Sequence, residues 1–333
     1  MECGVDRKPA IDPGKKLISR LADESTPSLM NPAIVSMVTC PICNSDETRF
    51  ALKVKDHSVS GEYFEIYECP RCNLRFTKDA PPRESIGRYY QSEDYISHSN
   101  TRKGIVNSLY HVVRNRTLAN KCHLLKSTTG MKQGLHLDIG AGTGSFVQYM
   151  NQHGWNSEGI EPDEKARARA LEHHQTKLLP ASAFETFSPE RFDAISLWHV
   201  LEHVHDLYPY LHRIKNILKP GGRVFIAVPN YTCYDAVKYG ADWAAYDVPR
   251  HLYHFSPASM QWLLKAAGFQ LKEMVPMWWD SYYISLLSEK YAGGHASLLK
   301  GFYTGALSNI KAMGDKEKCS SLIYVAEGIS LND

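Results

Sequence analysis

The chain predicts an α/β fold in which helices flank a doubly wound, mostly parallel sheet. Three observations carry this prediction. Apolar strand patterns alternate with helical ones, a glycine turn joins one strand to a helix start, and one apolar run suits a strand buried on both faces. With 333 residues, of which 43% are hydrophobic, the chain has room for one such domain and a small companion.

The glycine turn lies in the run LHLDIGAGTGSFV, residues 135–147. Alternating apolar residues before it predict a half-buried strand, and its glycines permit positive φ and the close approach of a ligand. A helix is expected from Ser145 to His153, and its free N–H groups favour an anionic group such as a phosphate or a carboxylate. A dinucleotide fingerprint needs a third glycine near Ser145, so the NAD interpretation is weaker.

The rest of the alternation follows from apolar runs and their end signals. The run 192–198 is nearly continuous and suits a central parallel strand, while LKPGG at 218–222 ends a helix. A capped amphipathic helix is expected over 256–268. The remaining strands are expected at 156–163, 223–229, 269–277 and 321–327.

Asp138 to Gly144 resembles the first motif of class I S-adenosylmethionine-dependent methyltransferases, an acidic residue and a hydrophobe followed by Gly-x-Gly-x-Gly. The blocks 192–198 and 218–229 are similar to the family's fourth and fifth strand segments. The resemblance covers roughly residues 135–271 and includes ubiquinone-type and sugar-type methyltransferases. It implies a Rossmann-like, seven-stranded sheet in which 321–327 is the last, antiparallel strand.

The same resemblance implies S-adenosylmethionine as cofactor, bound at the carboxyl ends of the strands. Glu161, 17 residues after Gly144, is expected to accept both ribose hydroxyls, the alternative being an ordinary strand-end acid. The turn at 181–184 lacks the acid that often contacts adenine, so backbone groups or Ser182 would serve. The expected cofactor-binding residues are Asp138, Gly140, Gly142, Gly144, Glu161, Ser182 and Trp198.

Two cysteine pairs, 25 residues apart, predict a structural zinc site. The asparagines after the pairs, Asn44 and Asn73, tolerate the left-handed backbone of a zinc knuckle. Short strands at 50–55 and 63–68 would complete a ribbon too small to fold without metal. Disulfides and a redox pair are the alternatives, disfavoured by a reducing compartment and by the lack of a thioredoxin-like context. The expected ligands are Cys40, Cys43, Cys69 and Cys72.

Charge and hydropathy exclude several partners. The net charge of +2 and the pI of about 8.0 are too small to indicate nucleic acid or an anionic membrane. Residues 40–88 carry eight basic and eight acidic side chains, so the charge pattern argues against nucleic-acid binding by the ribbon. Since no apolar run approaches the roughly 20 residues of a membrane span and 1–37 lack a signal peptide, a cytoplasmic protein is expected.

Four segments are therefore expected: a disordered leader at 1–37, a zinc-ribbon-like module at 38–80, a helical lid or linker at 81–132, and the methyltransferase domain at 133–333. Residues 103–126 look helical. By analogy with the family, Tyr89, Tyr90 and Tyr95 would fold over the cofactor, although an interdomain packing surface is an equal alternative. The oligomeric state does not follow from the sequence.

Candidate bases follow two strands. His251 and His254 are the preferred acceptor-facing pair, buried structural histidines being the alternative, and His199 is the reserve candidate. If a helix begins near His199, then His199, Glu202 and His203 share a face. That arrangement partly resembles the Glu-x-x-Glu-His metal site of small-RNA 2'-O-methyltransferases, but hydrogen bonding within the scaffold is the preferred role of Glu202 and His203.

The sequence thus predicts a methyltransferase that acts at oxygen or carbon of a small-molecule or carrier-bound acceptor. Trp278, Trp279, Tyr282 and Tyr283 would suit a flat or apolar acceptor, or serve as packing or a dimer face. One alternative is an RNA or protein methyltransferase guided by the ribbon. Another is a catalytically silent module that binds the cofactor.

Overall fold

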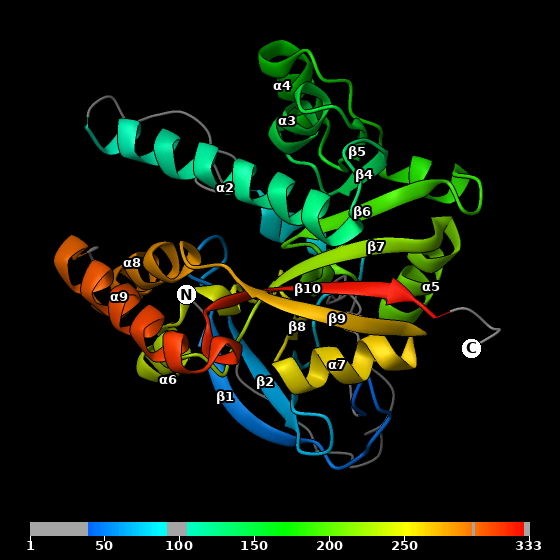
Figure 1. Ribbon diagram of the computed structural model, residues 1–333. Coiled ribbons are helices and arrows are strands. Elements are labelled where there is room, and N and C mark those ends of the chain that lie inside the picture. The colour runs from blue at the N-terminus through cyan, green and yellow to red at the C-terminus, as the bar shows by residue number, and fades with distance from the viewer. Residues whose placement is uncertain (1–38, 92–104, 295–296, 330–333) are drawn as a thin grey trace, which may run out of the picture. The chain divides into compact units, whose positions relative to one another are not determined.

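Two sheets organise the described residues of the computed structural model (Figure 1). The structure describes residues 39–91, 105–294 and 297–329, and side chains are described outside 105–114. The expected leader at 1–37 and Tyr95 lie outside these residues. Within the described residues, no helix combines the length and the apolar character needed to cross a bilayer.

The larger sheet has the strand order β5-β4-β6-β7-β10-β9. The first four strands in this order are parallel, and β10 runs antiparallel between β7 and β9. This arrangement confirms the parallel-dominated α/β sheet and its antiparallel last strand. The strands are β4 (Leu135–Ile139), β5 (Asn156–Ile160), β6 (Phe192–Trp198), β7 (Leu218–Pro229), β9 (Phe269–Pro276) and β10 (Ser321–Gly328).

The expected seventh strand is absent from this sheet among the described residues, where six strands are formed. An isolated parallel bridge between Ile160 and Leu179 stands at the edge, beside β5. Pro180 follows at once and has no N–H to donate to a ladder, and the short 3-10 helix η2 (Ala181–Thr186) comes next. The edge pairing therefore ends after one bridge.

Helices flank the sheet as the alternation predicted. The helices between its strands are α3 (Ser145–Gln152), α4 (Glu164–His174), α5 (Leu207–Ile217) and α7 (Pro257–Ala266). Ser256 caps α7 in a capping box with Ser259, with proline at the first helical position. The long helix α2 (Ile105–Thr129) packs against α3, β6 and β7. One boundary differs: α5 ends at Ile217, and residues 218–222, expected at the helix end, already belong to β7.

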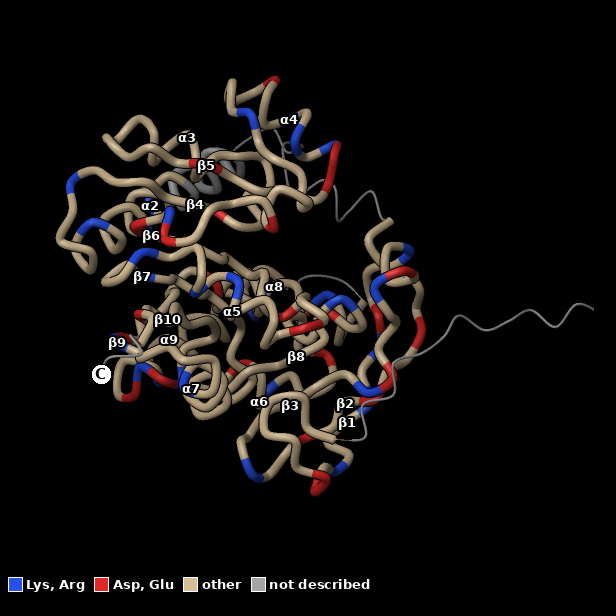
Figure 2. Tube along the Cα trace, turned by 90° about the vertical axis from the view of Figure 1, so that its right-hand side faces the viewer, with Lys and Arg blue, Asp and Glu red and all other residues tan. Residues whose placement is uncertain are grey.

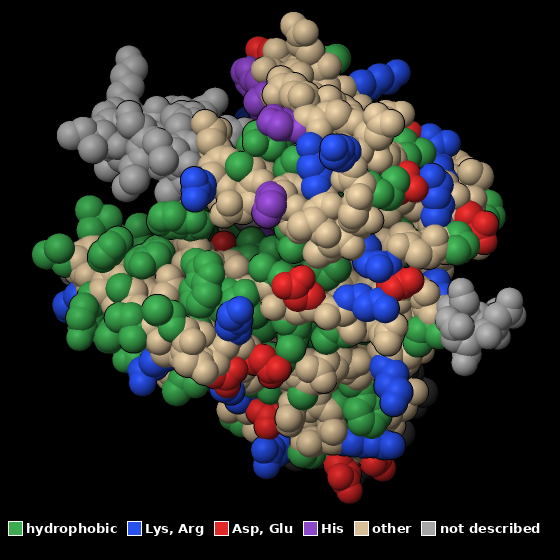
Figure 3. Space-filling view, viewed as in Figure 1, with side chains coloured by type: hydrophobic (Ala, Val, Ile, Leu, Met, Phe, Trp, Pro, Cys, Tyr) green, Lys and Arg blue, Asp and Glu red, His purple; other side chains and the backbone are tan. Residues whose placement is uncertain are grey.

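A helical hairpin is inserted between β9 and β10. It consists of α8 (Asp280–Gly293) and α9 (Leu298–Gly314), and α6 (Tyr234–Tyr239) packs against both. The two long helices approach closely, because a Cβ at Gly301 would lie 2.7 Å from Leu286 Cα and one at Gly305 would lie 2.8 Å from Tyr282 Cα. The hairpin exposes an apolar surface, visible over α8 and α9 in Figure 3; its members include Trp279, Tyr283, Leu298, Leu299, Phe302, Tyr303, Ile310 and Met313.

The smaller sheet is antiparallel, with the order β1-β2-β3-β8. Its first three strands, β1 (Arg49–Lys55), β2 (Tyr63–Cys69) and β3 (Leu74–Thr77), contain the two expected short strands. The fourth, β8 (Tyr253–His254), comes from the segment after β7 and pairs with Arg75 and Phe76 of β3. The ribbon is thus completed by the larger domain, a pairing that the sequence did not predict.

Candidate functional site

The three glycines of the turn between β4 and α3 have positive φ, but their surroundings differ. A Cβ at Gly140 would lie 2.5 Å from Val200 Cγ2, and one at Gly144 would lie 3.1 Å from Ala170 Cβ of α4. Gly142 has no atom within 4 Å of that position. Gly140 and Gly144 therefore allow close packing within the protein, while Gly142 faces open space.

The carboxylate of Glu161 lies directly under this turn, just past the end of β5. Its Oε2 accepts a 2.7 Å hydrogen bond from the Gly142 N–H, and its Oε1 accepts one from the Asp163 N–H at 2.9 Å. Glu161 is 8% exposed, and burial raises its pKa. The expected strand-end acid is therefore placed beside the one glycine of the turn that faces open space.

Asp138, the acid of the motif, is buried at 2% exposure on β4. It accepts a 2.5 Å hydrogen bond from Ser196 Oγ of the neighbouring strand β6, and burial raises its pKa to about 7. Lys121 of α2 lies with its Nζ 4.1 Å from the centre of the Trp198 ring at the end of β6. Sequence patterns gave no signal for Lys121, because only the packing of α2 on the sheet brings it here. Ser182 is exposed on η2.

His199 lies at the carboxyl end of β6 with a left-handed backbone (φ 57°). Its Nε2 is 3.1 Å from Asp280 Oδ2 of α8 and its Nδ1 is 3.4 Å from Glu202 Oε1. Burial alone would lower its pKa, but the two carboxylates outweigh burial and raise the pKa to about 10. With its side chain 35% exposed, His199 is the most accessible of the three candidate bases. Asp280 was not predicted, since it is 81 residues away in sequence.

The expected shared helical face of His199, Glu202 and His203 is not formed. The left-handed backbone of His199 prevents a helix from beginning at this residue. Only a short 3-10 helix, η3 (Leu201–His203), follows. His203 turns instead toward His251, whose ring lies 4.6 Å away at an interplanar angle of 76°.

The preferred base candidates are both buried. His254, 3% exposed on β8, places Nε2 3.2 Å from Thr77 Oγ1 of the ribbon, and burial lowers its pKa well below the usual range. His251 is 8% exposed, and its Nδ1 lies 2.9 Å from the Ala245 carbonyl. These surroundings fit a structural role, which was the alternative for both histidines, and they fit it best for His254.

Tyr89 and Tyr90 also make packing contacts. The Tyr89 hydroxyl donates to Glu62 Oε2 at 2.6 Å, and its backbone carbonyl accepts from Arg250 Nη1 at 2.8 Å. The Tyr90 hydroxyl lies 3.1 Å from His203 Nδ1. Tyr89 thus joins the ribbon to the larger domain. Of the aromatic residues after β9, Tyr282 stacks on Phe302 within the α8–α9 hairpin.

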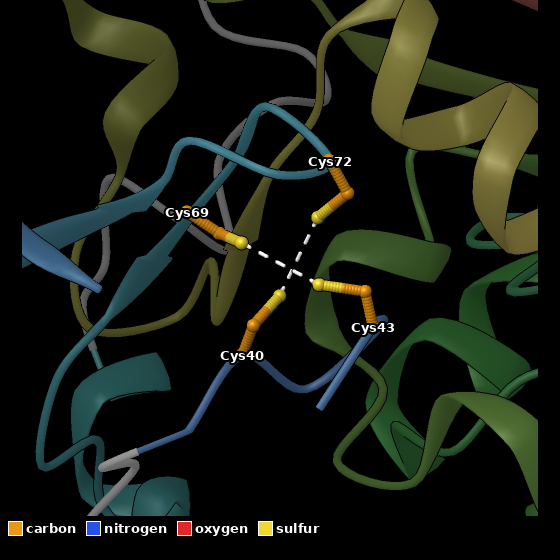
Figure 4. A group of neighbouring side chains, drawn as sticks. All are labelled: Cys40, Cys43, Cys69 and Cys72. Atoms are coloured by element: carbon orange, nitrogen blue, oxygen red, sulfur yellow. Dashed lines mark hydrogen bonds between the residues drawn. The ribbon is translucent and has the colours of Figure 1, made fainter. Parts of the chain in front are cut away.

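The four cysteines of the ribbon converge from two turns (Figure 4). Their sulfur atoms all lie within 4.8 Å of one another, and the pairs Cys40–Cys72 and Cys43–Cys69 are 3.4 Å apart. Around a tetrahedral zinc ion with bonds of about 2.3 Å, sulfurs lie about 3.8 Å apart, so the arrangement fits zinc. A hydrogen bond with the Cys72 thiol lowers the pKa of Cys40 to about 5.

The backbone of both cysteine turns has the expected knuckle form. Asn44 and Asn73 have φ of 54° and 56°, which confirms the left-handed prediction. Their N–H groups each donate a 2.9 Å hydrogen bond to the carbonyl four residues earlier, at Cys40 and Cys69.

Comparison with known proteins finds similar sequences for the segment that carries the glycine turn. Residues 114–273 match the family model of a methyltransferase domain. The ubiquinone biosynthesis O-methyltransferase of Aeromonas salmonicida is 32% identical over 151 residues, 41% of this chain and 63% of that protein. The enzyme of the same name from Pseudomonas entomophila is 28% identical over 152 residues, 42% of this chain and 66% of that protein.

The chain therefore spans slightly less than two thirds of the length of these curated relatives. Among solved structures, magnesium protoporphyrin IX methyltransferase from Synechocystis, with bound S-adenosylhomocysteine, has a TM-score of 0.49 at 14% identity. That match covers 74% of this chain and 99% of that one.

Proposed function

We propose that the protein transfers a methyl group from S-adenosylmethionine to oxygen or carbon of a small-molecule or carrier-bound acceptor. The observation that carries the proposal is the open space at Gly142 beside the Glu161 carboxylate, at the carboxyl ends of β4 and β5. The match of residues 114–273 to a methyltransferase domain and the relatives' name, O-methyltransferase, support it.

When bound, S-adenosylmethionine supplies an electrophilic methyl group on a sulfonium. Glu161 would accept hydrogen bonds from the ribose hydroxyls, and the turn containing Gly142 would bring backbone N–H groups close to the ligand. Asp138 and Trp198, at the neighbouring strand ends, would complete this side of the site. Ser182 would face the adenine. For the enzyme, the main gains are orientation of the acceptor and exclusion of water.

Cofactor binding should depend on Glu161. Replacing Glu161 by alanine removes a charge-assisted acceptor, worth roughly 1.5 to 3 kcal/mol, so the Kd should rise roughly 10- to 150-fold in titration calorimetry. Gly142→Val should also weaken binding, because its side chain would enter the open space. Glu158→Gln is the control, since Glu158 lies on β5, three residues before Glu161, but pairs with Arg191. Unchanged affinity in both Glu161→Ala and Gly142→Val would contradict the assignment.

A hydroxyl or acidic-carbon acceptor must lose a proton as its new bond to the methyl carbon forms and the carbon–sulfur bond breaks. We propose His199 as the residue that takes this proton, ahead of His251 and His254. Because its pKa of about 10 keeps the ring protonated at neutral pH, only its neutral form acts as the base, and turnover should rise with pH toward that value. His199 is the most exposed of the three and stands beside Val200, which packs on the glycine turn. Asp280 and Glu202 hold its ring in place.

His199→Ala should lower turnover by roughly a hundredfold while cofactor affinity stays near that of wild type. His254→Ala should instead lower the melting temperature and leave the turnover of the folded fraction largely intact, because His254 packs against the ribbon. Steady-state kinetics, calorimetry and thermal unfolding on the same preparations separate these effects. If His254→Ala lowered turnover and His199→Ala lowered only the melting temperature, His254 would be the base.

Incubation with methyl-labelled cofactor and fractionated metabolite, RNA and protein pools tests the reaction. Label in a small molecule supports the proposal. Label in RNA or protein would favour the alternative, an RNA or protein methyltransferase guided by the ribbon. Figure 2 gives no support for RNA binding there, since charges of both signs are spread along β1 to β3. Cofactor binding without label transfer to any pool would indicate a catalytically silent module.

We also propose that Cys40, Cys43, Cys69 and Cys72 bind one structural zinc ion. Four thiolates fill a tetrahedral shell and leave no position for substrate or water. The converging sulfurs and the two left-handed asparagines support this role.

A further inference from the structure

The side chains of Glu202, His203 and His251 form a second cluster of metal-ligand type, separate from the four cysteines. One ligand atom from each lies within 4.8 Å of the others. Glu202 and His203 belong to η3, and His251 reaches them from the segment before β8. The two segments are tied together by the Leu252 N–H, which donates a 2.8 Å hydrogen bond to the Glu202 carbonyl.

The carboxylate of Glu202 is the main clue. It is fully buried, and neither of its oxygens accepts a hydrogen bond from the described part of the chain. Its ion-pair contact with His199 Nδ1 is 3.4 Å long and involves Oε1. A buried carboxylate is costly unless a cation or several donors compensate it. The imidazolium of His199 meets Oε1 alone, and Oε2 has no hydrogen-bond donor among the described residues, so a cation on the side of His203 and His251 would complete the compensation.

The two imidazoles are oriented as metal ligands usually are. His203 Nδ1 lies 3.0 Å from the Arg250 carbonyl, and His251 Nδ1 lies 2.9 Å from the Ala245 carbonyl. A carbonyl oxygen can only accept, so Nδ1 of His251 carries the hydrogen and its Nε2 keeps a free lone pair. We assign the same tautomer to His203, with the Tyr90 hydroxyl, 3.1 Å from Nδ1, as a second acceptor. Backbone carbonyls that hold the outer nitrogen in this way are the common support of metal-bound histidines.

The other charged groups near the cluster contact Arg250, which balances only one of the two carboxylates that it pairs with. Asp247, 4.0 Å from His251 Nε2, accepts hydrogen bonds from Arg250 on both of its oxygens. Arg250 also pairs with Asp56 of the ribbon. The cluster thus offers two imidazole nitrogens and one carboxylate oxygen in surroundings with a surplus of negative charge.

We propose that Glu202, His203 and His251 bind a divalent transition-metal ion. Two imidazoles and one carboxylate suit Zn²⁺ or Fe²⁺ and leave coordination positions open. The group expected from the sequence was His199, Glu202 and His203. In the structure, His251 joins Glu202 and His203 instead, and His199 contacts Glu202 without belonging to the cluster. The proposal does not rest on the proposed methyl transfer.

Metal content and X-ray absorption of the full chain test the proposal with Zn²⁺ as the probe. After loading and desalting, wild type should retain two zinc equivalents per chain and show both sulfur and nitrogen or oxygen scattering. Glu202→Gln and His251→Gln should each retain one equivalent with sulfur scattering only. His205→Gln is the matched control, because His205 follows η3 but bonds the Pro81 carbonyl instead, and it should retain two.

Circular dichroism and thermal unfolding establish that each variant is folded before its metal content is compared. If a variant fails to fold, Co²⁺ is titrated into the wild-type protein instead. Co²⁺ bound by nitrogen and oxygen ligands adds visible absorption bands without the sulfur-to-metal charge-transfer bands of a cysteine site. One zinc equivalent with sulfur-only scattering in folded wild type, together with no such Co²⁺ bands and no retained Fe²⁺, would overturn the proposal. Loss of methyl transfer alone would leave it standing.

Discussion

Replacement of Cys69 by serine is expected to remove one equivalent of zinc and to unfold the ribbon. A structural zinc ion in a small module contributes on the order of 10 kcal/mol, because the site and the fold form together. A three-stranded ribbon buries too little apolar surface to persist without it. Because β3 pairs with β8, the loss should extend to the segment around His254 in the larger domain.

Elemental analysis and hydrogen exchange measure the two consequences separately. Zinc content should fall by one equivalent, and exchange should become fast in β1 to β3 and in β8. Cys122→Ser is the control, since Cys122 is a buried free thiol on α2, outside the cluster. Full zinc content and slow exchange in Cys69→Ser would show that the cysteines do not hold the metal.

Elements with local signals could be predicted from the sequence. The strand β6 has the expected bounds, since the apolar run Phe192–Trp198 has no break within it. The cap of α7 follows from Ser256 and the proline after it, and the knuckle turns follow from asparagine after each cysteine pair. In each case, neighbouring residues alone determine the conformation.

Features that depend on distant packing were not predictable in this way. The seventh strand is a different case: it was expected from the family resemblance alone, and a local signal, Pro180, limits it to one bridge. The pairing of β8 with the ribbon, and the contacts of Asp280 and Lys121, join residues far apart in sequence. A left-handed histidine at 199 has no turn signal in its neighbours. The positive φ of the turn glycines could therefore be predicted, whereas the contacts of His199 and Lys121 could not.

Arg250→Met is expected to destabilise the protein by about 3 to 5 kcal/mol, the usual cost of leaving a buried charge unpaired. The guanidinium is 1% exposed and bonds Asp56 at 2.9 Å, Asp247 at 2.6 Å and the Tyr89 carbonyl at 2.8 Å. It thereby connects the β1–β2 turn and η1 (Ile86–Tyr90) of the ribbon side to the segment before β8. Methionine keeps much of the apolar volume but leaves both carboxylates without their cation.

Urea unfolding at neutral pH measures this loss, and Arg49→Met is the matched control. Arg49 forms an ion pair with Glu68, but its side chain is 69% exposed, so its loss should cost less than about 1 kcal/mol. Adding Asp56→Asn to Arg250→Met should recover part of the stability, because one uncompensated charge disappears. Equal losses in the two arginine variants would contradict the role of Arg250.

The pH dependence provides an independent check. Burial alone would raise the pKa of Asp56 and Asp247, but Arg250 outweighs burial and lowers both. A lowered folded-state pKa means that these groups stabilise the protein above the ordinary carboxyl pKa of about 4, and that this stabilisation is lost as the pH falls through the folded value. In Arg250→Met, burial should raise both pKa values, so protonation in mild acid relieves the unpaired charges. The stability difference from wild type should therefore be largest near pH 7 and narrow toward about pH 4; a difference that stays constant over this range would show that lost packing, rather than charge, causes it.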